Sequence, residues 1–204
     1  MSRKPIIVFE GVEGSGKSLH INYVANHLKK NKIKFIKIRE PGGNPDSEKI
    51  RRLILNNKSN FHKTTDLLLY FASRNENIEK IIKKNIKKKI ILIDRFIDST
   101  IAYQHYGMGI DLNFINSVNK FLLKNIKPNF TFLNLVSKKN MKLRLSRRKK
   151  NNRYDKFKSK FYNRVQSGFI KIANKNKKKY LKINSNLDIS INKKIIISMI
   201  GKLI

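Results

Sequence analysis

The segment that most constrains the fold lies near the start of the chain, where residues 9–18 read FEGVEGSGKS. An apolar run, PIIVFEG, leads into this segment, and an amphipathic stretch, KSLHINYVANHLKK, continues from its lysine. The GxxxxGK[ST] spacing is typical of a loop whose backbone N–H groups bind phosphates between a strand and a helix. The sequence therefore predicts a β-strand, a phosphate-binding loop and an α-helix in that order, which is the first unit of an α/β fold.

Four later segments are also predicted to be β-strands, and they alternate with helical patterns. Their sequences are IKFIKIRE, KIILID, KPNFTFLNLV and KYLKIN. Strands that alternate with helices favour a mostly parallel sheet covered on both faces, with ligands bound beyond the carboxyl ends of the strands. A length of 204 residues with 40% apolar residues fits one domain over residues 1–204.

The remaining helices are predicted from apolar periodicity and capping residues. NPDSEKIRRLILNN is expected to form a helix with Asn44 as its N-cap and Pro45 at its first position. Further helices are expected over about 64–88, over DLNFINSVNKFLLKN opening at Asp111, over KKNMKLRLSRRKK, over about 158–175 and from about 188 onward.

Composition excludes several classes of protein. The chain has no cysteine, which rules out a disulfide framework, a thiolate zinc site and a cysteine nucleophile. We find no uninterrupted apolar run of the length that spans a membrane and no signal-peptide pattern. These features lead us to expect a cytoplasmic protein without a membrane partner.

The formal net charge of +34 raises the question of a nucleic-acid partner. The basic residues are spread along the whole chain among Asn and Ile, as in KKNIKKKIILI. Lys, Asn and Ile have AT-rich codons, so we interpret the charge as compositional bias on a solvated surface, and nucleic-acid binding is not expected to be the function. A nucleic-acid-binding protein that keeps only the phosphate-loop scaffold stays the alternative from another class.

Glycine is scarce, and its placement predicts ligand-binding loops. Seven of the nine glycines fall in three clusters, at Gly11/Gly14/Gly16, Gly42/Gly43 and Gly107/Gly109. Glycine is used where a backbone must adopt φ > 0 or approach a ligand closely. We therefore expect each cluster to mark a ligand loop.

The phosphate loop and one later strand predict a donor-nucleotide site with a magnesium ion. Lys17 is expected to reach the β- and γ-phosphates of ATP, and the Ser18 hydroxyl to bind Mg²⁺. Asp94, at the end of the apolar run KIILID, is expected to hold Mg²⁺ through water. The predicted ATP-binding residues are Gly11, Val12, Glu13, Gly14, Ser15, Gly16, Lys17 and Ser18.

Three other segments carry a family resemblance over essentially the entire chain. They are REPGG at 39–43, YFASRNE at 70–76 and DRFIDSTIAYQ at 94–104. Together with GVEGSGKS they resemble the thymidylate kinase family, in the bacterial form with a basic, arginine-bearing lid and no arginine in the phosphate loop. The resemblance implies a P-loop nucleoside-monophosphate kinase fold with a five-stranded parallel sheet and a short lid. It also implies Mg²⁺-dependent transfer of the γ-phosphoryl group of ATP to dTMP, in dTTP synthesis, by a homodimer.

The resemblance assigns a set of residues to the acceptor, dTMP. Arg39 and Arg95 would bind its phosphate, a task that suits guanidinium groups. Tyr70, at a position where the family usually has Phe, would stack on thymine, and Tyr103 would crowd the 2′-position of the sugar. Glu13 would contact the 3′-hydroxyl rather than ATP. The residues implied to contact the base are Arg74, Ser99, Thr100 and Gln104.

The resemblance also implies a lid over about 144–157 that supplies positive charge to the transferring phosphoryl group. Arg148 and Arg153 are the expected lid arginines, with Arg147 in reserve. Asn152 stands where the family usually has Asp, which leaves the choice of arginine open. The predicted catalytic residues are therefore Lys17, Arg95, Arg148 and Arg153, and a (deoxy)nucleotide kinase of relaxed base choice is the alternative within the enzymes.

Overall fold

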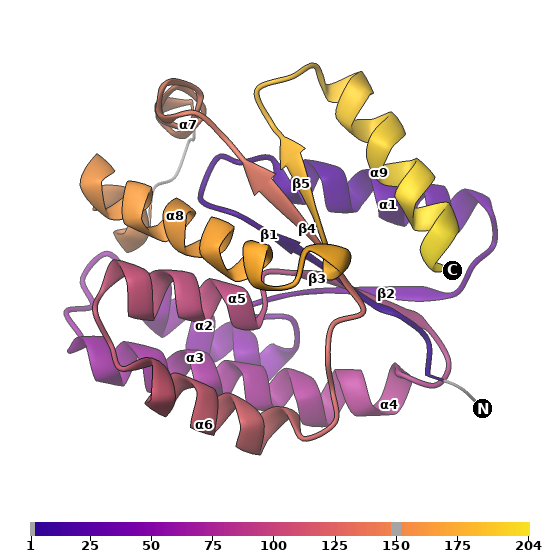
Figure 1. Ribbon diagram of the computed structural model, residues 1–204. Coiled ribbons are helices and arrows are strands. Elements are labelled where there is room, and N and C mark those ends of the chain that lie inside the picture. The colour runs from indigo at the N-terminus through magenta and orange to yellow at the C-terminus, as the bar shows by residue number, and fades with distance from the viewer. Residues whose placement is uncertain (1–2, 148–151) are drawn as a thin grey trace.

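A five-stranded parallel β-sheet forms the centre of the computed structural model, which describes residues 3–147 and 152–204 (Figure 1). The strand order is β2-β3-β1-β4-β5, and all four neighbouring pairs run parallel. The fold class and the five predicted strands are thereby confirmed. The strands are β1 (Ile6–Glu10), β2 (Phe35–Arg39), β3 (Ile90–Asp94), β4 (Phe130–Leu135) and β5 (Tyr180–Asn184).

Helices cover both faces of this sheet. One face carries α1 (Lys17–Lys30) and α9 (Ile189–Leu203), which pack on each other. The opposite face carries a larger layer, and α7 (Lys138–Ser146) follows β4 beyond the carboxyl ends of the strands (Figure 1). The larger layer comprises α2 (Pro45–Leu55), α3 (Lys63–Asn77), α5 (Ile97–Thr100), α6 (Leu112–Leu123) and α8 (Ser159–Lys175).

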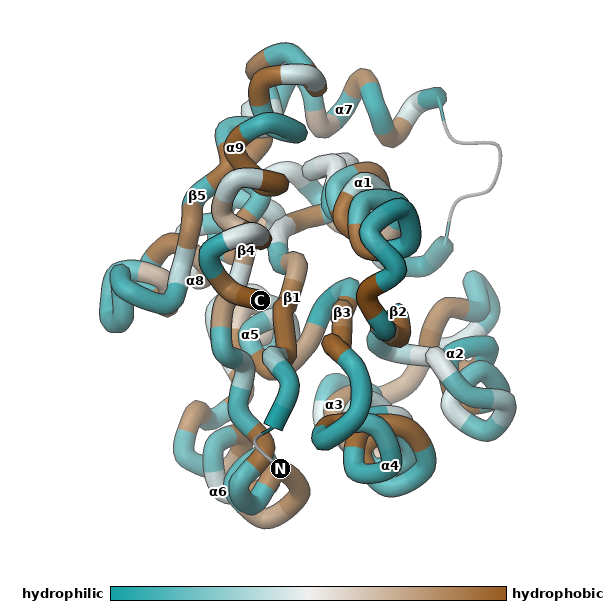
Figure 2. Tube along the Cα trace, turned by 90° about the vertical axis from the view of Figure 1, so that its right-hand side faces the viewer, coloured by the Kyte–Doolittle hydropathy of each residue, from teal (hydrophilic) through white to brown (hydrophobic). Residues whose placement is uncertain are grey.

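The alternation of side chains along β1 explains why the sheet has two separate cores. Ile7 and Phe9 pack with residues of α1 and α9. Ile6 and Val8 point to the other side and pack with residues that follow α3 and with the end of α6. Because β1 is buried on both faces, its residues from Ile6 to Phe9 form a continuous apolar run rather than an alternating one, and this run is brown in Figure 2.

Two predicted helix starts are confirmed by their caps. The Asn44 side chain accepts hydrogen bonds from the backbone N–H groups of Asp46 and Ser47, and Pro45 is the first residue of α2. The Asp111 carboxylate accepts from Phe114 N at the start of α6. Each cap satisfies N–H groups that have no partner inside the helix.

Two helical segments differ from the prediction. The helix expected over about 64–88 is interrupted after α3 by a π-helical segment, η1 (Ile78–Ile82), before the short α4 (Lys83–Asn85). Residues 97–107, which were not predicted to be helical, form α5 and the π-helical segment η2 (Ile101–Gly107). Their inward face carries buried polar side chains, among them Asp98, Thr100 and Gln104, so the segment lacks an apolar helical stripe.

The third glycine cluster has a packing role. A Cβ atom added at Gly107 would lie 2.7 Å from the ring of Phe161 in α8, which packs against η2. An added Cβ at Gly109, which has φ of 73°, would have no heavy atom of the described residues within 4 Å. Gly107 therefore allows a close helix–helix contact, and the expectation of a ligand loop at this cluster stays a prediction. Across the described ranges, we find no helix that is both long enough and apolar enough to span a membrane.

Candidate active site

The carboxyl ends of β1, β2 and β3 meet at one cavity of about 210 Å³. This is the position that the parallel sheet predicts for a ligand. The cavity brings together the phosphate loop, the turn after β2, the face of α3, the segment after β3 and the chain near residue 152. Its lining residues are Glu13, Lys17, Ser18, Arg39, Glu40, Pro41, Arg51, Leu55, Tyr70, Arg74, Asp94, Arg95, Phe96, Ser99, Thr100, Tyr103, Gln104, Asn152 and Tyr154.

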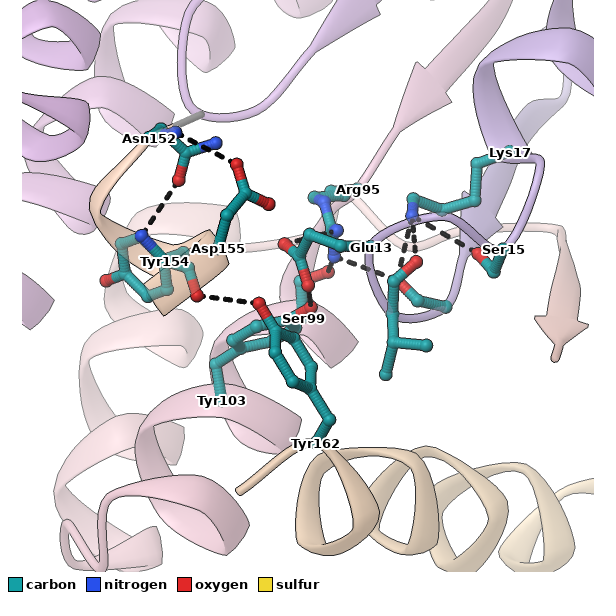
Figure 3. A network of polar contacts seen from close by, with 12 residues as sticks. Glu13, Ser15, Lys17, Arg95, Ser99, Tyr103, Asn152, Tyr154, Asp155 and Tyr162 are labelled. Atoms are coloured by element: carbon teal, nitrogen blue, oxygen red, sulfur yellow. Dashed lines mark hydrogen bonds and ion pairs between the residues drawn. The ribbon is translucent and has the colours of Figure 1, made fainter. Parts of the chain in front are cut away.

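The phosphate loop is a tight turn whose lysine points back across it. Lys17 Nζ donates to the backbone oxygens of Gly11 at 2.9 Å and Val12 at 2.8 Å (Figure 3). At Gly11, with φ of 139°, a Cβ atom would lie 2.3 Å from the backbone oxygen of Asn134, so only glycine fits. Burial, together with the charge of Arg95, lowers the pKa of Lys17 to about 7.

Two oxygen groups stand side by side where the predicted magnesium ion would bind. Ser18 Oγ donates to Asp94 Oδ2 at 2.8 Å, so the loop and the end of β3 are in direct contact. Hydroxyl and carboxylate oxygens are ligands that Mg²⁺ prefers, and Mg²⁺ is usually held by few protein groups together with substrate phosphates and water. Within the described residues there is no cluster of three or more His, Cys, Asp or Glu side chains, and this pair fits Mg²⁺ without one.

Glu13 is tied to the acceptor segment rather than to the loop's own lysine. Its carboxylate pairs with Arg95 Nη2 at 2.9 Å and accepts a short hydrogen bond from the Tyr103 hydroxyl (Figure 3). Burial raises the pKa of the Glu13 carboxyl, but the charges of Arg95 and Lys17 outweigh it, and the net pKa is lowered. Burial raises the pKa of Tyr103 well above its ordinary value, so the phenol stays protonated and donates.

Arg95 lies at the junction of the two halves of the site. Its backbone has φ of 68°, a conformation that a side-chain-bearing residue rarely adopts. Its Nη1 donates to Gly11 O at 2.9 Å and to Ser99 Oγ at 3.3 Å, and its guanidinium lies 5.2 Å from the centre of the Tyr103 ring. The residue thus spans from the phosphate loop to the helix that carries Ser99 and Tyr103.

Glu10, the last residue of β1, holds the start of that helix. Its fully buried carboxylate accepts from the backbone N–H groups of Phe96 at 2.7 Å and Ser99 at 3.2 Å, and from Ser99 Oγ at 2.5 Å. Phe96 is the N-cap position of α5 and provides no side-chain cap itself. A carboxylate on β1 therefore caps α5. This contact fixes Arg95 and Ser99 relative to Gly11, which follows Glu10 in the chain.

Arg74 is buried, with 1% of its surface exposed, and most of its donors are occupied. Nε pairs with Glu40 Oε2 at 2.8 Å, Nη1 donates to Asn119 Oδ1 at 2.8 Å, and Nη2 donates to Phe96 O at 3.0 Å and to Thr100 Oγ1 at 2.8 Å. Among the described residues these bonds leave one N–H of Nη1 for a further acceptor. The predicted base-contacting arginine is thus held rigidly at the cavity wall.

The other predicted acceptor residues also line the cavity. Tyr70, four residues before Arg74 on α3, faces it beside Tyr154. Gln104 Nε2 is buried, and no residue in the described part of the chain accepts a hydrogen bond from it. Arg39 is exposed and pairs with Glu48 at 3.1 Å.

The two predicted lid arginines differ in what can be said of them. Arg148 lies outside the described residues. Arg153 opens a 3-10 turn, η3 (Arg153–Lys156), and its Nη2 contacts both carboxylate oxygens of Asp66 on α3. The prediction that Arg153 acts on ATP stays a prediction, since the guanidinium faces α3 in this structure.

Sequence reasoning missed four residues that contribute to the site. Glu10 is a lone charge at the end of an apolar strand. Arg51 lies on the buried face of α2, four residues after the buried Ser47, and it lines the cavity. Tyr154 lines the cavity from η3. Arg144 donates from α7 to Gly14 O at 3.0 Å and Ser185 O at 2.6 Å. A charged residue within an apolar pattern could have indicated Glu10 and Arg51. The roles of Tyr154 and Arg144 depend on tertiary contacts.

A phosphate loop that leads into one end of a cavity lined by arginines and aromatic rings defines a class of protein. It is a P-loop kinase of the nucleoside-monophosphate type, in which the loop binds the donor and the cavity binds a small phosphorylated acceptor.

Comparison with known proteins gives the family. The family model described as thymidylate kinase matches residues 9–196. A thymidylate kinase of a Sulfurihydrogenibium species is 38% identical over 193 residues, which cover 94% of each chain. The thymidylate kinase of Wolbachia pipientis is 41% identical over 82% of this chain and 84% of its own. The crystal structure of thymidylate kinase from Ehrlichia chaffeensis matches with a TM-score of 0.79 and 33% identity, covering 98% of this chain and 99% of that one.

The chain belongs to the thymidylate kinase family. The resemblance noted from REPGG and DRFIDSTIAYQ is confirmed, and with it the enzyme class, a transferase of nucleotide biosynthesis. The family's reaction is the ATP-dependent phosphorylation of dTMP to dTDP.

Proposed function

We propose that the chain carries out this reaction with the donor on the phosphate loop and dTMP in the adjoining cavity. The observation that carries the proposal is the contact of Glu13, in the loop, with Arg95 and Tyr103, in the acceptor segment. This contact makes the donor loop and the acceptor cavity one continuous site. Two substrates bound there would have their reacting groups adjacent, which is the main requirement for phosphoryl transfer.

On the donor side, residues Gly11 to Ser18 would hold the ATP phosphates through their backbone N–H groups. Lys17 Nζ would exchange its bonds to Gly11 O and Val12 O for bonds to the β- and γ-phosphates. Ser18 and Asp94 would hold Mg²⁺, which neutralises phosphate charge when bound.

On the acceptor side, the phosphate of dTMP would lie among the guanidinium groups of Arg39, Arg51 and Arg95, all of which line the cavity. The base would lie against Tyr70, with the remaining Nη1 donor of Arg74 and the Nε2 donor of Gln104 available to its carbonyl oxygens. These two N–H groups can only donate hydrogen bonds. They therefore pair with the carbonyl oxygen at position 4 of thymine and not with the amino group that cytosine has there. This arrangement favours dTMP over dCMP.

The neighbouring hydroxyl and carboxylate groups complete the acceptor site. Ser99 and Thr100 line the cavity, although their side chains bond to Glu10 and Arg74, so their predicted base contact would add to those bonds. Glu13 would accept from the deoxyribose 3′-hydroxyl, and the ring of Tyr103, 5% exposed, would occupy the space of a 2′-hydroxyl.

The chemistry asks for positioning and charge neutralisation rather than for a general base. The second pKa of a monoester phosphate is about 6, so the attacking oxygen of dTMP is already ionised at neutral pH. Lys17 and Arg95 would neutralise the donor and acceptor charges, and lid arginines, with Arg148 as one candidate, would stabilise the transferring phosphoryl group. Residues 1–204 would form one domain with a lid over about 144–157, in a cytoplasmic protein.

Exposed apolar side chains on two helices of the larger layer support the proposed homodimer. Phe114 and Phe121, seven residues apart on α6, are exposed, Phe121 to 75%. Leu68 on α3 is also exposed, and α3 lies beside α6 in both views (Figures 1 and 2). Large exposed apolar side chains on adjoining helices are typical of an interaction surface. Light scattering of the purified protein tests the dimer, and Phe121→Lys should shift it to monomer.

The experiment that tests the proposed function compares acceptors in parallel. Release of ADP from ATP and Mg²⁺ is measured with dTMP, dUMP, dCMP and dGMP. We expect dTMP to give the highest kcat/KM and dCMP to be slower by at least about 100-fold, because an unpaired polar group in the base site costs several kcal/mol. Equal rates with all four would point to a kinase of relaxed base choice.

A further inference from the structure

The last part of the proposed lid, from Asn152 to Lys156, contacts helix α3, and this contact connects it to the acceptor cavity. The carboxylate of Asp66 on α3 accepts from Arg153 Nη2 through both of its oxygens, and its Oδ2 accepts from the Tyr154 hydroxyl at 3.1 Å. Asp66 is buried, with 4% of its surface exposed. These two donors come from consecutive residues, so one carboxylate holds the start of η3.

The local structure of the segment strengthens this contact. Asn152 caps η3 by accepting from Tyr154 N at 2.8 Å, and the Asp155 carboxylate accepts from Asn152 N at 2.9 Å. The Tyr162 hydroxyl of α8 donates to Tyr154 O at 2.7 Å (Figure 3). The turn is therefore shaped by its own capping box and held from two helices, α3 and α8.

The consequence of this attachment is the position of the Tyr154 ring. Tyr154 is 3% exposed and lines the acceptor cavity. Its ring centre lies 6.2 Å from that of Tyr70 and 6.1 Å from that of Tyr103, in edge-to-face geometry in both cases. Tyr70 is the ring assigned to the base and Tyr103 the ring assigned to the sugar, so Tyr154 completes an aromatic wall that the acceptor would touch.

The contacts of Arg153 argue against a movement of this residue to the phosphates. Besides Asp66, the guanidinium lies 5.3 Å from the centre of the Tyr154 ring and 6.0 Å from that of Phe61. If Arg153 left, the buried Asp66 carboxylate would lose its charge partner, and a buried unpaired charge is strongly unfavourable. The geometry favours a fixed role for this arginine.

We propose that Asp66 and Arg153 form a clamp that positions Tyr154 as a wall of the dTMP site, so that Arg153 acts on acceptor binding rather than on the transferring phosphoryl group. Asp66 and Arg153 are positioning residues, and Tyr154 is the residue that would touch the substrate. The positive charge at the transferring phosphoryl group then comes from other residues of the lid. This inference rests on the proposed binding of dTMP in the cavity.

A double-mutant cycle tests the clamp. Asp66→Asn, Arg153→Gln and the double variant are assayed for kcat, KM for dTMP and KM for ATP. Each single change should raise KM for dTMP about tenfold and leave KM for ATP within about twofold, since only the acceptor wall is displaced. The double variant should match the single variants, because both changes remove the same contact.

Matched controls remove one acidic and one basic charge from α2, a helix that carries neither clamp residue. Asp46→Asn and Arg52→Gln should leave all three parameters unchanged, since neither residue lines the cavity. Tyr154→Phe keeps the ring and removes only the hydroxyl that donates to Asp66, so it should raise KM for dTMP less than Asp66→Asn does. This variant also tests the clamp if the charge variants fold poorly, which thermal unfolding would reveal.

Two results would overturn the proposal. If Arg153→Gln lowers kcat at least about 100-fold at saturating substrates while Asp66→Asn does not, Arg153 acts on the phosphoryl group. If Asp66→Asn and Tyr154→Phe both leave KM for dTMP unchanged, the clamp does not shape the acceptor site. A wild-type protein that makes no dTDP in the same assay would instead refute the proposed function.

Discussion

Replacing Arg74 by leucine should destabilise the whole protein as well as the base site. The Glu40 carboxylate, 5% exposed, has its charge paired by Arg74 Nε at 2.8 Å, and Glu40 Oε1 accepts no hydrogen bond within the described part of the chain. Breaking a buried ion pair by removing one partner costs about 3–5 kcal/mol. For a protein of this length, about 2–4 °C of melting temperature is lost per kcal/mol, so Arg74→Leu should lower Tm by about 6–20 °C.

A second variant separates the effect of the unpaired Glu40 charge on stability from the effect of the smaller side chain at position 74. In the double variant Arg74→Leu with Glu40→Gln, no charge is left unpaired, so about half of the lost stability should return. Thermal and urea unfolding measure both variants, and calorimetry should show dTMP binding weakened far more than ATP binding in each. A single variant that loses less than about 1 kcal/mol, or a double variant no more stable than the single one, would show that the unpaired Glu40 charge is not the cause.

Three further changes test separate parts of the account. Lys17→Ala should lower kcat at least about 100-fold with an unchanged circular dichroism spectrum, and a loss within about tenfold, or about 1.4 kcal/mol, would contradict its role. In calorimetry, Glu13→Gln should weaken dTMP binding about tenfold and ATP binding by less than about twofold. The reason is that the carboxylate contacts Arg95 and Tyr103 of the acceptor segment. A loss of affinity confined to ATP would contradict this. Burial, reinforced by the Glu10 carboxylate, raises the pKa of Asp98 to about 7. The folded protein therefore keeps this carboxyl protonated between about pH 4 and pH 7, where the unfolded chain ionises it. The stability that this protonation gives the folded state is lost as pH rises through about 7. Between pH 5 and pH 8, the free energy of unfolding in urea should therefore fall by about 2–3 kcal/mol more in wild type than in Asp98→Asn, and parallel profiles would contradict the shift.

The parts of the site that follow a strand could be predicted from the sequence. The phosphate loop follows an apolar run, and Arg39 and Asp94 end their strands, with Arg95 next. Parallel strands have their carboxyl ends at one edge of the sheet. The acceptor residues in 70–74 and 99–104 were assigned through family resemblance, and the structure places them around the same cavity. Their roles with substrates remain proposals.

The parts that could not be predicted depend on hydrogen bonds between distant segments. Asn119 lies 45 residues from Arg74, and Asp66 lies 87 residues from Arg153, and nothing in the local pattern of either pair marks the contact. The helical segment over 97–107 was not predicted because its inward side chains are polar and form hydrogen bonds with distant segments. Ser99 donates to Glu10, and Asp98 accepts from Tyr180. Periodicity detects burial of apolar groups and does not detect polar groups that are buried with partners.

Phosphorus NMR can follow the transfer of a phosphoryl group from ATP to dTMP by this chain, because it observes both nucleotides at once. With ATP, Mg²⁺ and dTMP, we expect the resonances of dTDP and ADP to grow together in equal amounts as those of dTMP and ATP decline. Lys17→Ala should abolish this change. Consumption of ATP to ADP and inorganic phosphate, with dTMP left unchanged, would contradict the account.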